Sequence, residues 1–226
     1  MIYIVAVLIS VFFAALVTGI KDRRYFKDEK HGVAEIFAKN KKFAIVTALI
    51  FAAVTVAGCI IFAYNEVAYW VMFRWLVLIY GTYILAYIDS KERLIPNKIL
   101  LGLLIIRLAF LVYEIIISID NIKLALVPFG LGALIMGGII FVAMLISRNG
   151  VGMGDVKLFL VIGMFVGSTA ALPTMFFTFF ASAVVGIFML SVKKAKLKDS
   201  MPMAPFALFG LTLNFIISFI NFGSTV

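Results

Sequence analysis

The chain has 226 residues, of which 65% are hydrophobic and 14% are charged, and its formal net charge is +9. Soluble domains typically contain about 45–50% apolar and about 25% charged residues. The composition therefore excludes a soluble enzyme, a disordered chain and a nucleic-acid-binding domain. It favours a membrane protein, with the lipid bilayer as its surroundings.

Eight apolar runs are close to the length that crosses a bilayer, for which about 20 residues rise roughly 30 Å as a helix. The first run lacks a basic start and an A-x-A cleavage site, so we expect it to be retained. The sixth and seventh runs meet at Pro173. The predicted fold is all-α: a polytopic membrane protein with about eight transmembrane helices and short loops, in which residues 1–226 form a single membrane domain. The predicted spans are 2–20, 43–64, 68–88, 98–118, 124–147, 156–172, 173–191 and 203–222.

Basic residues predict the orientation of these spans. Most of the 20 Lys and Arg fall in loops that share one side if all eight runs cross, with the richest groups at 21–42 and 193–198. Because Lys and Arg accumulate in cytoplasmic loops, we expect a multi-pass protein of the cell membrane with 21–42 in the cytoplasm and both termini outside. The positive charge then reflects topology and attraction to anionic headgroups.

Two carboxylates lie at predicted span ends on the same face. Asp89 ends the third run and Asp155 opens the sixth, and the two spans between them return the chain to the cytoplasmic side. Ionisable groups near hydrocarbon are candidates for function. Two carboxyl groups that share a site do not both ionise easily, so one keeps its proton. Such a pair suits amide hydrolysis, in which one carboxylate activates water and the other acid polarises the carbonyl.

The residues alone leave other functions open. Cys59 lies inside an apolar run and the single His31 in the basic segment, so neither indicates a nucleophile–histidine arrangement. A proton- or ion-coupled transporter using the two Asp is the main alternative, although such sites tend to lie at the midplane of paired repeats, and no repeat is visible. The third possible function is a membrane scaffold without catalytic activity, in which the two Asp hold helices together.

Three glycines precede the second candidate carboxylate, in Gly150-Val151-Gly152-Met153-Gly154-Asp155. Glycine permits positive φ and close approach of the backbone. We therefore expect this loop to come close to a substrate, which could add to it as an extended strand.

These motifs together resemble those of the prepilin leader peptidases, which are GxGD-type aspartyl proteases. The resemblance rests on Asp89 followed by Ile95-Pro96-Asn97, and on Gly152-Met153-Gly154-Asp155-Val156-Lys157. The segment Met201-Pro202-Met203-Ala204-Pro205-Phe206 is similar to the Pro-rich start of the family's last span. The resemblance covers about residues 70–222, which we take as the peptidase core.

The resemblance implies an aspartic-type endopeptidase that removes the short basic leader peptide from prepilin or pseudopilin-like proteins at the cytoplasmic membrane face. It implies that Asp89 and Asp155 are the catalytic pair. Helix ends predict a division of roles, because the dipole favours a carboxylate at Asp155 and a protonated acid at Asp89. The other implied site residues are Gly152 and Gly154, which shape the loop; Pro96 and Asn97, which fix the turn; Lys157, which anchors the span or orients Asp155; and Glu92, which meets the leader or is surface charge.

One departure from the family concerns zinc. Many bacterial relatives carry paired Cys-x-x-Cys motifs in a cytoplasmic domain associated with N-methylation of the processed pilin, whereas 21–42 contains no Cys. Thiolate-bound zinc is therefore excluded there. We expect a peptidase with no metal and no other cofactor, and without the methyl transfer.

Two further features are predicted to be structural. Arg107 and Glu114 are two turns apart on one helix face, too far for direct contact in most rotamers, so each is expected to snorkel or to meet another helix, with contact to the substrate as the alternative. Glycines within the apolar runs are predicted to permit close helix packing; they are Gly137, Gly138, Gly163, Gly167 and Gly186.

Overall fold

The computed structural model describes residues 53, 55–56, 68–147, 151–192 and 201–222. The predicted span 2–20, nearly all of 43–64, the basic segment 21–42 and the Lys cluster at 193–198 lie outside the described residues. The chain divides into two compact units, Met1–Leu76 and Val77–Val226. The second unit holds the motifs singled out above.

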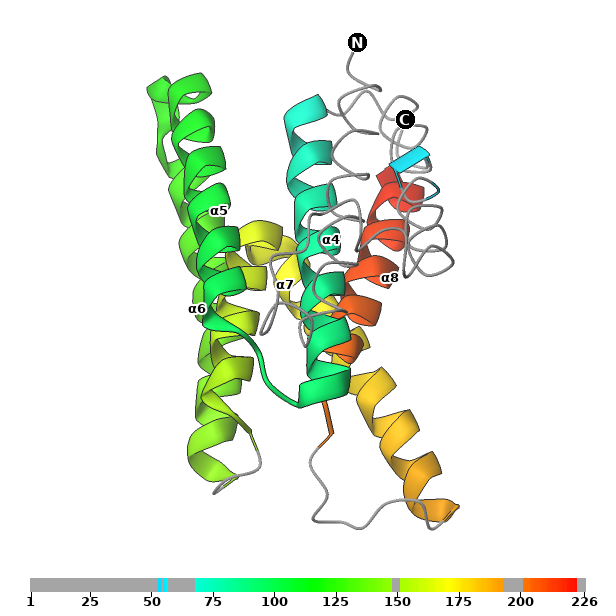
Figure 1. Cartoon of the computed structure of the whole chain (residues 1–226). Coiled ribbons are helices and arrows are strands. Elements are labelled where there is room, and N and C mark those ends of the chain that lie inside the picture. Colours follow the sequence, from blue (N-terminus) through cyan, green and yellow to red (C-terminus); the bar gives the residue numbers. More distant parts are fainter. Residues whose placement is uncertain (1–52, 54, 57–67, 148–150, 193–200, 223–226) are drawn as a thin grey trace, which may run out of the picture. The chain divides into compact units, whose positions relative to one another are not determined.

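From residue 68 onward, the described chain consists of five α-helices joined by short connections, without a strand (Figure 1). A short 3-10 helix, η2 (Ile119–Asn121), follows the second of them. The all-α prediction is confirmed for these residues. The helices are α4 (Tyr69–Glu92), α5 (Asn97–Ile117), α6 (Lys123–Ile146), α7 (Met153–Ser191) and α8 (Ala204–Phe222).

Four of these helices, α4 to α7, are long and apolar enough to cross a membrane, and a shorter apolar stretch covers Ala204–Ile217. The prediction of about eight spans is therefore not confirmed. Helices α5 and α6 match the predicted runs 98–118 and 124–147 to within one residue at each end. Helix α4 continues to Glu92, so Asp89 lies inside its last turn rather than after it.

The predicted boundary between the sixth and seventh spans is wrong. Residues 153–191 form two helical arms, and the break between them lies at Gly167, where φ is 78° and ψ is 179°, not at Pro173. That backbone conformation is essentially restricted to glycine. Proline, by contrast, keeps a helical φ and removes one N–H donor, so Pro173 remains inside the helix. Figure 1 shows α7 as two arms that diverge from the break, with both free ends on the side where α4 stops.

Glycines allow α7 to pack closely against its neighbours. A methyl group on Gly163 would overlap the backbone of Gly132 in α6, and one on Gly137 would lie 3.0 Å from Leu160 Cβ. On the other arm, Gly210 of α8 packs against the Thr174–Thr178 turn. Close packing is thus confirmed at Gly137 and Gly163. Gly138 faces open space, contrary to expectation, and the contacts of Gly132 and Gly210 were not anticipated from the sequence.

The second arm of α7 is also joined to α8 by buried polar side chains. Asn214 Nδ2 donates to Thr174 Oγ1 at 3.0 Å and to the Ala170 carbonyl at 3.3 Å. Thr174 and Asn214 are both buried. Hydrogen bonds between helices of this kind are a common means of association in membranes, so this arm and α8 form one packed pair.

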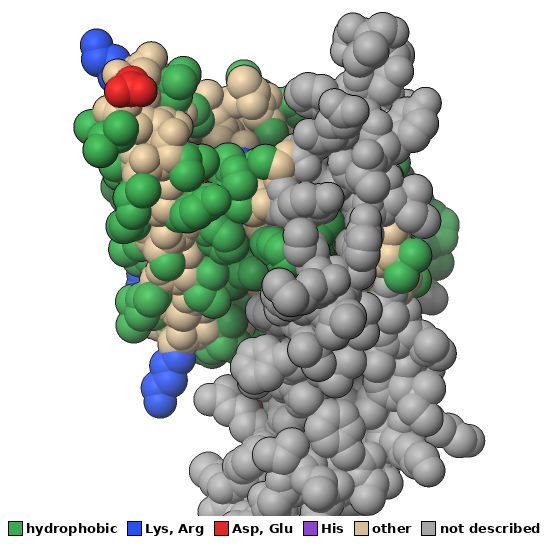
Figure 2. Space-filling view, turned by 90° about the horizontal axis from the view of Figure 1, so that it is seen from above, with side chains coloured by type: hydrophobic (Ala, Val, Ile, Leu, Met, Phe, Trp, Pro, Cys, Tyr) green, Lys and Arg blue, Asp and Glu red, His purple; other side chains and the backbone are tan. Residues whose placement is uncertain are grey.

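Large apolar side chains cover the outer faces of α5 and α6. In the view of Figure 2, hydrophobic side chains cover most of the described surface and charged ones lie at its edges. A continuous exposed apolar surface of this kind is unfavourable in water, and it is what contact with lipid requires. The most exposed of these side chains include Ile105, Val112, Ile116, Leu124, Leu134 and Leu145.

Candidate active site at the ends of α4, α7 and α8

Asp89 lies in the last turn of α4 and is only 5% exposed. Its Oδ2 accepts a hydrogen bond of 3.0 Å from the backbone N–H of Ala204, the first residue of α8. N–H groups in the first turn of a helix have no partner within that helix, so the carboxylate completes the start of α8. The Pro-rich segment 201–206 is thereby brought to a residue 115 positions away in the sequence.

Asp155 lies in the first turn of α7, where it is the third residue after the N-cap Gly152. Its Oδ2 accepts a hydrogen bond of 3.1 Å from the Gly152 N–H. This contact is the acidic half of a capping box. It orients the Asp155 carboxyl group at the N-terminus of α7.

Gly152 and Gly154 do not adopt positive φ, and Gly154 serves close packing. Gly152 has an extended backbone (φ −82°, ψ 152°), and among the described glycines only Gly167 has a positive φ. A Cβ on Gly154 would lie 3.3 Å from Ile95 Cβ. The N–H and the carbonyl of Gly152 both bond to Asp155, so strand addition at Gly152 would compete with this cap. Gly150 lies outside the described residues.

The Ile95-Pro96-Asn97 motif contacts the Gly154–Lys157 motif directly. Lys157 Nζ donates to Asn97 Oδ1 at 3.1 Å, across 60 residues of sequence. Pro96 is the N-cap of α5, and its carbonyl accepts the Ile99 N–H at 3.1 Å. Lys157 thus joins the start of α7 to the turn that follows α4.

The structure brings the segments that carry the two candidate carboxylates into contact, because Ile95 lies against Gly154 and Lys157 bonds to Asn97. Asp155 is close enough to Asp89 for the two groups to interact electrostatically. Each has its own backbone donor, Ala204 or Gly152, so the two are held from different helices. Glu92 is exposed at the last residue of α4, one turn beyond Asp89, and its contact with a leader stays a prediction.

Within the described ranges, no group of three or more His, Cys, Asp or Glu side chains is placed to hold a metal ion. Two neighbouring carboxyl groups can serve as an acid and a base. The expectation that the protein needs no cofactor stays a prediction.

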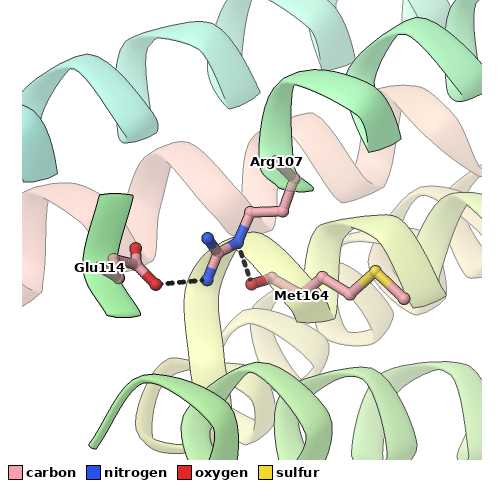
Figure 3. A network of polar contacts seen from close by, with 3 residues as sticks. All are labelled: Arg107, Glu114 and Met164. Atoms are coloured by element: carbon pink, nitrogen blue, oxygen red, sulfur yellow. Dashed lines mark hydrogen bonds and ion pairs between the residues drawn. The ribbon is translucent and has the colours of Figure 1, made fainter. Parts of the chain in front are cut away.

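Arg107 and Glu114 of α5 form a buried ion pair, which corrects the prediction that they lie too far apart. Arg107 Nη2 and Glu114 Oε2 are 3.0 Å apart, and the side chains are 2% and 6% exposed. Two turns rise about 10.5 Å, a distance that two long side chains span together when a third group holds the guanidinium. That group is the carbonyl of Met164 in α7, which accepts a 2.7 Å hydrogen bond from Arg107 Nε (Figure 3).

Two of the contacts that define the site could not be read from the motifs. The Ala204 N–H that bonds Asp89 is a backbone group and leaves no side-chain signal, although the Pro-rich segment marked its position. The Met164 carbonyl is likewise a backbone group, which no side-chain motif marks. Its signal was the nearby Gly167, which the sequence indicated only as a packing glycine.

The fold and the site define a multi-helix membrane protein with paired acids at helix ends. The sequence model of the type IV leader peptidase family matches residues 76–190, just over half of the chain. The chain belongs to this family. The matched range contains Asp89, the Ile95-Pro96-Asn97 turn and Asp155. No curated protein and no solved structure matches the chain.

The chain is therefore a leader-peptidase-like protease. The family is membrane-embedded, and its peptidases are of the aspartic type. The family match gives no support to the transporter alternative. The family also indicates prepilin-type substrates in general.

Proposed function

We propose that the chain is an endopeptidase that removes short basic leader peptides from prepilin-type proteins at the cytoplasmic membrane face, with Asp89 and Asp155 as its catalytic pair. The observation that carries the proposal is the convergence of three separate motifs on these two carboxyl groups. Ala204 at the start of α8 bonds Asp89 at the end of α4, and Lys157 at the start of α7 bonds Asn97 in the turn that follows α4. Hydrolysis by two carboxyl groups requires one of them ionised and the other protonated.

In the proposed mechanism, one ionised carboxylate removes a proton from a water molecule as its oxygen attacks the carbonyl carbon of the scissile peptide bond. The other, protonated Asp donates a hydrogen bond to the carbonyl oxygen. When the tetrahedral intermediate collapses, the C–N bond breaks and the amine leaves with a proton from the acid. The catalytic pair then returns to its starting state of one shared proton.

Asp155 is proposed as the base. The N-terminus of α7 and the Gly152 N–H both stabilise a carboxylate at this position. Asp89 lies between two helix ends that oppose each other, the C-terminus of α4 and the N-terminus of α8. The helix ends therefore favour the ionised form of Asp155, whereas at Asp89 their effects oppose each other. We assign Asp89 the role of proton carrier.

The proposed orientation rests on the charged residues around the site. Lys91, Arg93, Lys98 and Lys157 are exposed at this end of the helices, as expected of a cytoplasmic face. A basic leader would be drawn to anionic headgroups there and to Glu92, while the apolar segment that follows it stays in the bilayer. No methyl transfer is expected, because segment 21–42 has no Cys for a zinc module.

The test is cleavage in proteoliposomes that contain the purified chain and a peptide with a basic leader, a Gly at the cleavage site and an apolar helix. Asp89→Asn and Asp155→Asn are each expected to abolish cleavage, whereas Asp120→Asn, an exposed acid in η2, leaves it unchanged. Normal cleavage by either catalytic variant would refute the assignment. Proton flux that depends on both Asp, in the absence of cleavage, would favour the transporter instead.

A further inference from the structure

The break in α7 exposes a backbone acceptor deep in the apolar part of the molecule. In a regular helix the Met164 carbonyl accepts the N–H of the residue four positions later, Ser168. Gly167, with its φ of 78° and ψ of 179°, lies between them. Met164 is thus the first residue whose helical partner lies beyond the break. Inside a membrane such a carbonyl must find another donor within the protein.

Arg107 supplies that donor from α5. Its Nε donates to the Met164 carbonyl at 2.7 Å (Figure 3). The guanidinium carbon lies 5.1 Å from the ring centre of Phe129 and 6.0 Å from that of Phe165. A cation at this position also complements the negative end of the first arm of α7. The guanidinium therefore takes the place of the missing helical N–H.

Glu114 makes a buried Arg107 tolerable. An unpaired charge in hydrocarbon is costly, so ionisable residues inside membranes pair with one another or with backbone carbonyls. Arg107 does both, because Glu114 Oε2 lies 3.0 Å from its Nη2 and the Met164 carbonyl accepts from its Nε. Both side chains come from α5, so this neutral pair belongs to one helix and presents a donor to another.

The first arm of α7, residues 153–166, is consequently attached to α5 at two heights. Near its start, Lys157 bonds to Asn97, and near its end the Met164 carbonyl bonds to Arg107. Lys157 and Met164 are seven residues apart, which places them two turns apart on the same helix face. Two attachments on one face fix both the axial position and the rotation of the arm that carries Asp155.

We propose that Arg107 and Glu114 form a positioning pair for Asp155: the Arg107 contact to Met164 sets the height at which the first arm of α7 presents Asp155 to Asp89. The proposal rests on the function proposed above. Asp89 is held independently by the Ala204 N–H. Removing the Arg107 contact should therefore shift Asp155 relative to Asp89 while leaving the α4–α8 contact in place.

The first test compares Arg107→Met with Arg107→Lys in the proteoliposome assay, with Leu108→Met, an exposed neighbour on α5, as the matched control. Because misplacement by about 1 Å can lower a rate about a hundredfold, Arg107→Met is expected to lower kcat about ten- to a hundredfold with KM nearly unchanged. Arg107→Lys keeps a charged donor and should recover much of the rate. A kcat for Arg107→Met within about twofold of wild type, or equal losses in Arg107→Met and Arg107→Lys, would overturn the proposal.

The second test measures the placement of the arm without relying on activity. In a Cys59→Ala background, the pair Ile95→Cys and Gly154→Cys reports contact between the turn after α4 and α7, where the two Cβ positions are 3.3 Å apart. The control pair, Gly81→Cys and Leu103→Cys, joins α4 to α5, with Leu103 Cγ 3.1 Å from the Gly81 Cβ position. A disulfide joins Cβ atoms about 3.5–4.5 Å apart. The first pair lies just below this range, and in the second Leu103 Cγ marks the place of a Cys Sγ.

Arg107→Met is expected to slow formation of the first disulfide in native membranes and to leave the second unchanged. Loss of both disulfides would mark a purely structural role and overturn the proposal, as would loss of neither. This measurement also separates the positioning role of Arg107 from the proposed peptidase activity. If the wild-type chain does not cleave the leader, the proposed function fails, whereas the disulfide comparison still decides whether Arg107 sets the position of α7.

Discussion

A methyl group at Gly132 has no room between α6 and α7, and this makes Gly132→Ala a sharp test of how the first arm of α7 is packed. The added Cβ would overlap the Gly163 carbonyl oxygen and would lie 2.8 Å from the Gly167 carbonyl carbon. All of these neighbours are backbone atoms, which cannot rotate away. The helices would have to part by about half an ångström or more to restore normal packing.

The magnitude follows from a comparison with two glycines of the same helix. A Cβ on Gly130 or Gly138 would meet nothing within 4 Å, so Ala at these positions changes only helix propensity, by up to about 1 kcal/mol in favour of Ala. Ala at Gly132 gains the same term but also overpacks the contact, which costs about 1–3 kcal/mol. The difference between Gly132→Ala and the two controls is therefore the packing cost itself.

The assay is reversible unfolding in mixed micelles, followed by circular dichroism as the fraction of denaturing detergent increases. We expect Gly132→Ala to unfold about 1–3 kcal/mol more easily than Gly138→Ala. Cleavage should also fall, because the arm that moves carries Asp155. Unfolding curves that coincide for Gly132→Ala and Gly138→Ala would refute the close contact of α6 with α7.

Three further predictions concern other contacts. Asn97→Ala and Lys157→Met should each reduce kcat/KM for the leader peptide. Because both remove the same hydrogen bond, kcat/KM of the double variant should equal that of the less active single variant. Asn214→Leu removes two hydrogen bonds to α7 and should lower the free energy of unfolding by about 1–3 kcal/mol in the mixed-micelle assay. Gly167→Ala forces a side chain into a glycine-only conformation and should lower the thermal midpoint, since such strain costs about 1–3 kcal/mol.

Each of these has a clear contrary result. Fully additive losses in Asn97→Ala and Lys157→Met would show that the two side chains act independently. For Asn214→Leu, stability equal to wild type would mean that the α7–α8 pair does not depend on its polar contacts. A Gly167→Ala variant as stable as Gly130→Ala would show that α7 does not need the positive φ at its break.

The sequence by itself determined the helical class, the approximate bounds of α4, α5, α6 and α8, and the identity of the motif residues. A chain segment in a bilayer must satisfy its own backbone hydrogen bonds, so an apolar run of suitable length predicts its own helix without knowledge of its neighbours. The two Asp were likewise visible, because ionisable residues at span ends are few in so apolar a chain.

The tertiary structure decided what depends on distant neighbours. The sequence placed a break at Pro173, but proline is compatible with a helix that continues, and the break lies at Gly167, which packs against Gly132 of α6. Sequence spacing also argued against the Arg107–Glu114 contact, which forms because a third group, the Met164 carbonyl of α7, holds the guanidinium. A carbonyl released by a break in one helix and a donor offered by another are related only through packing, and no local pattern in the chain records that relation.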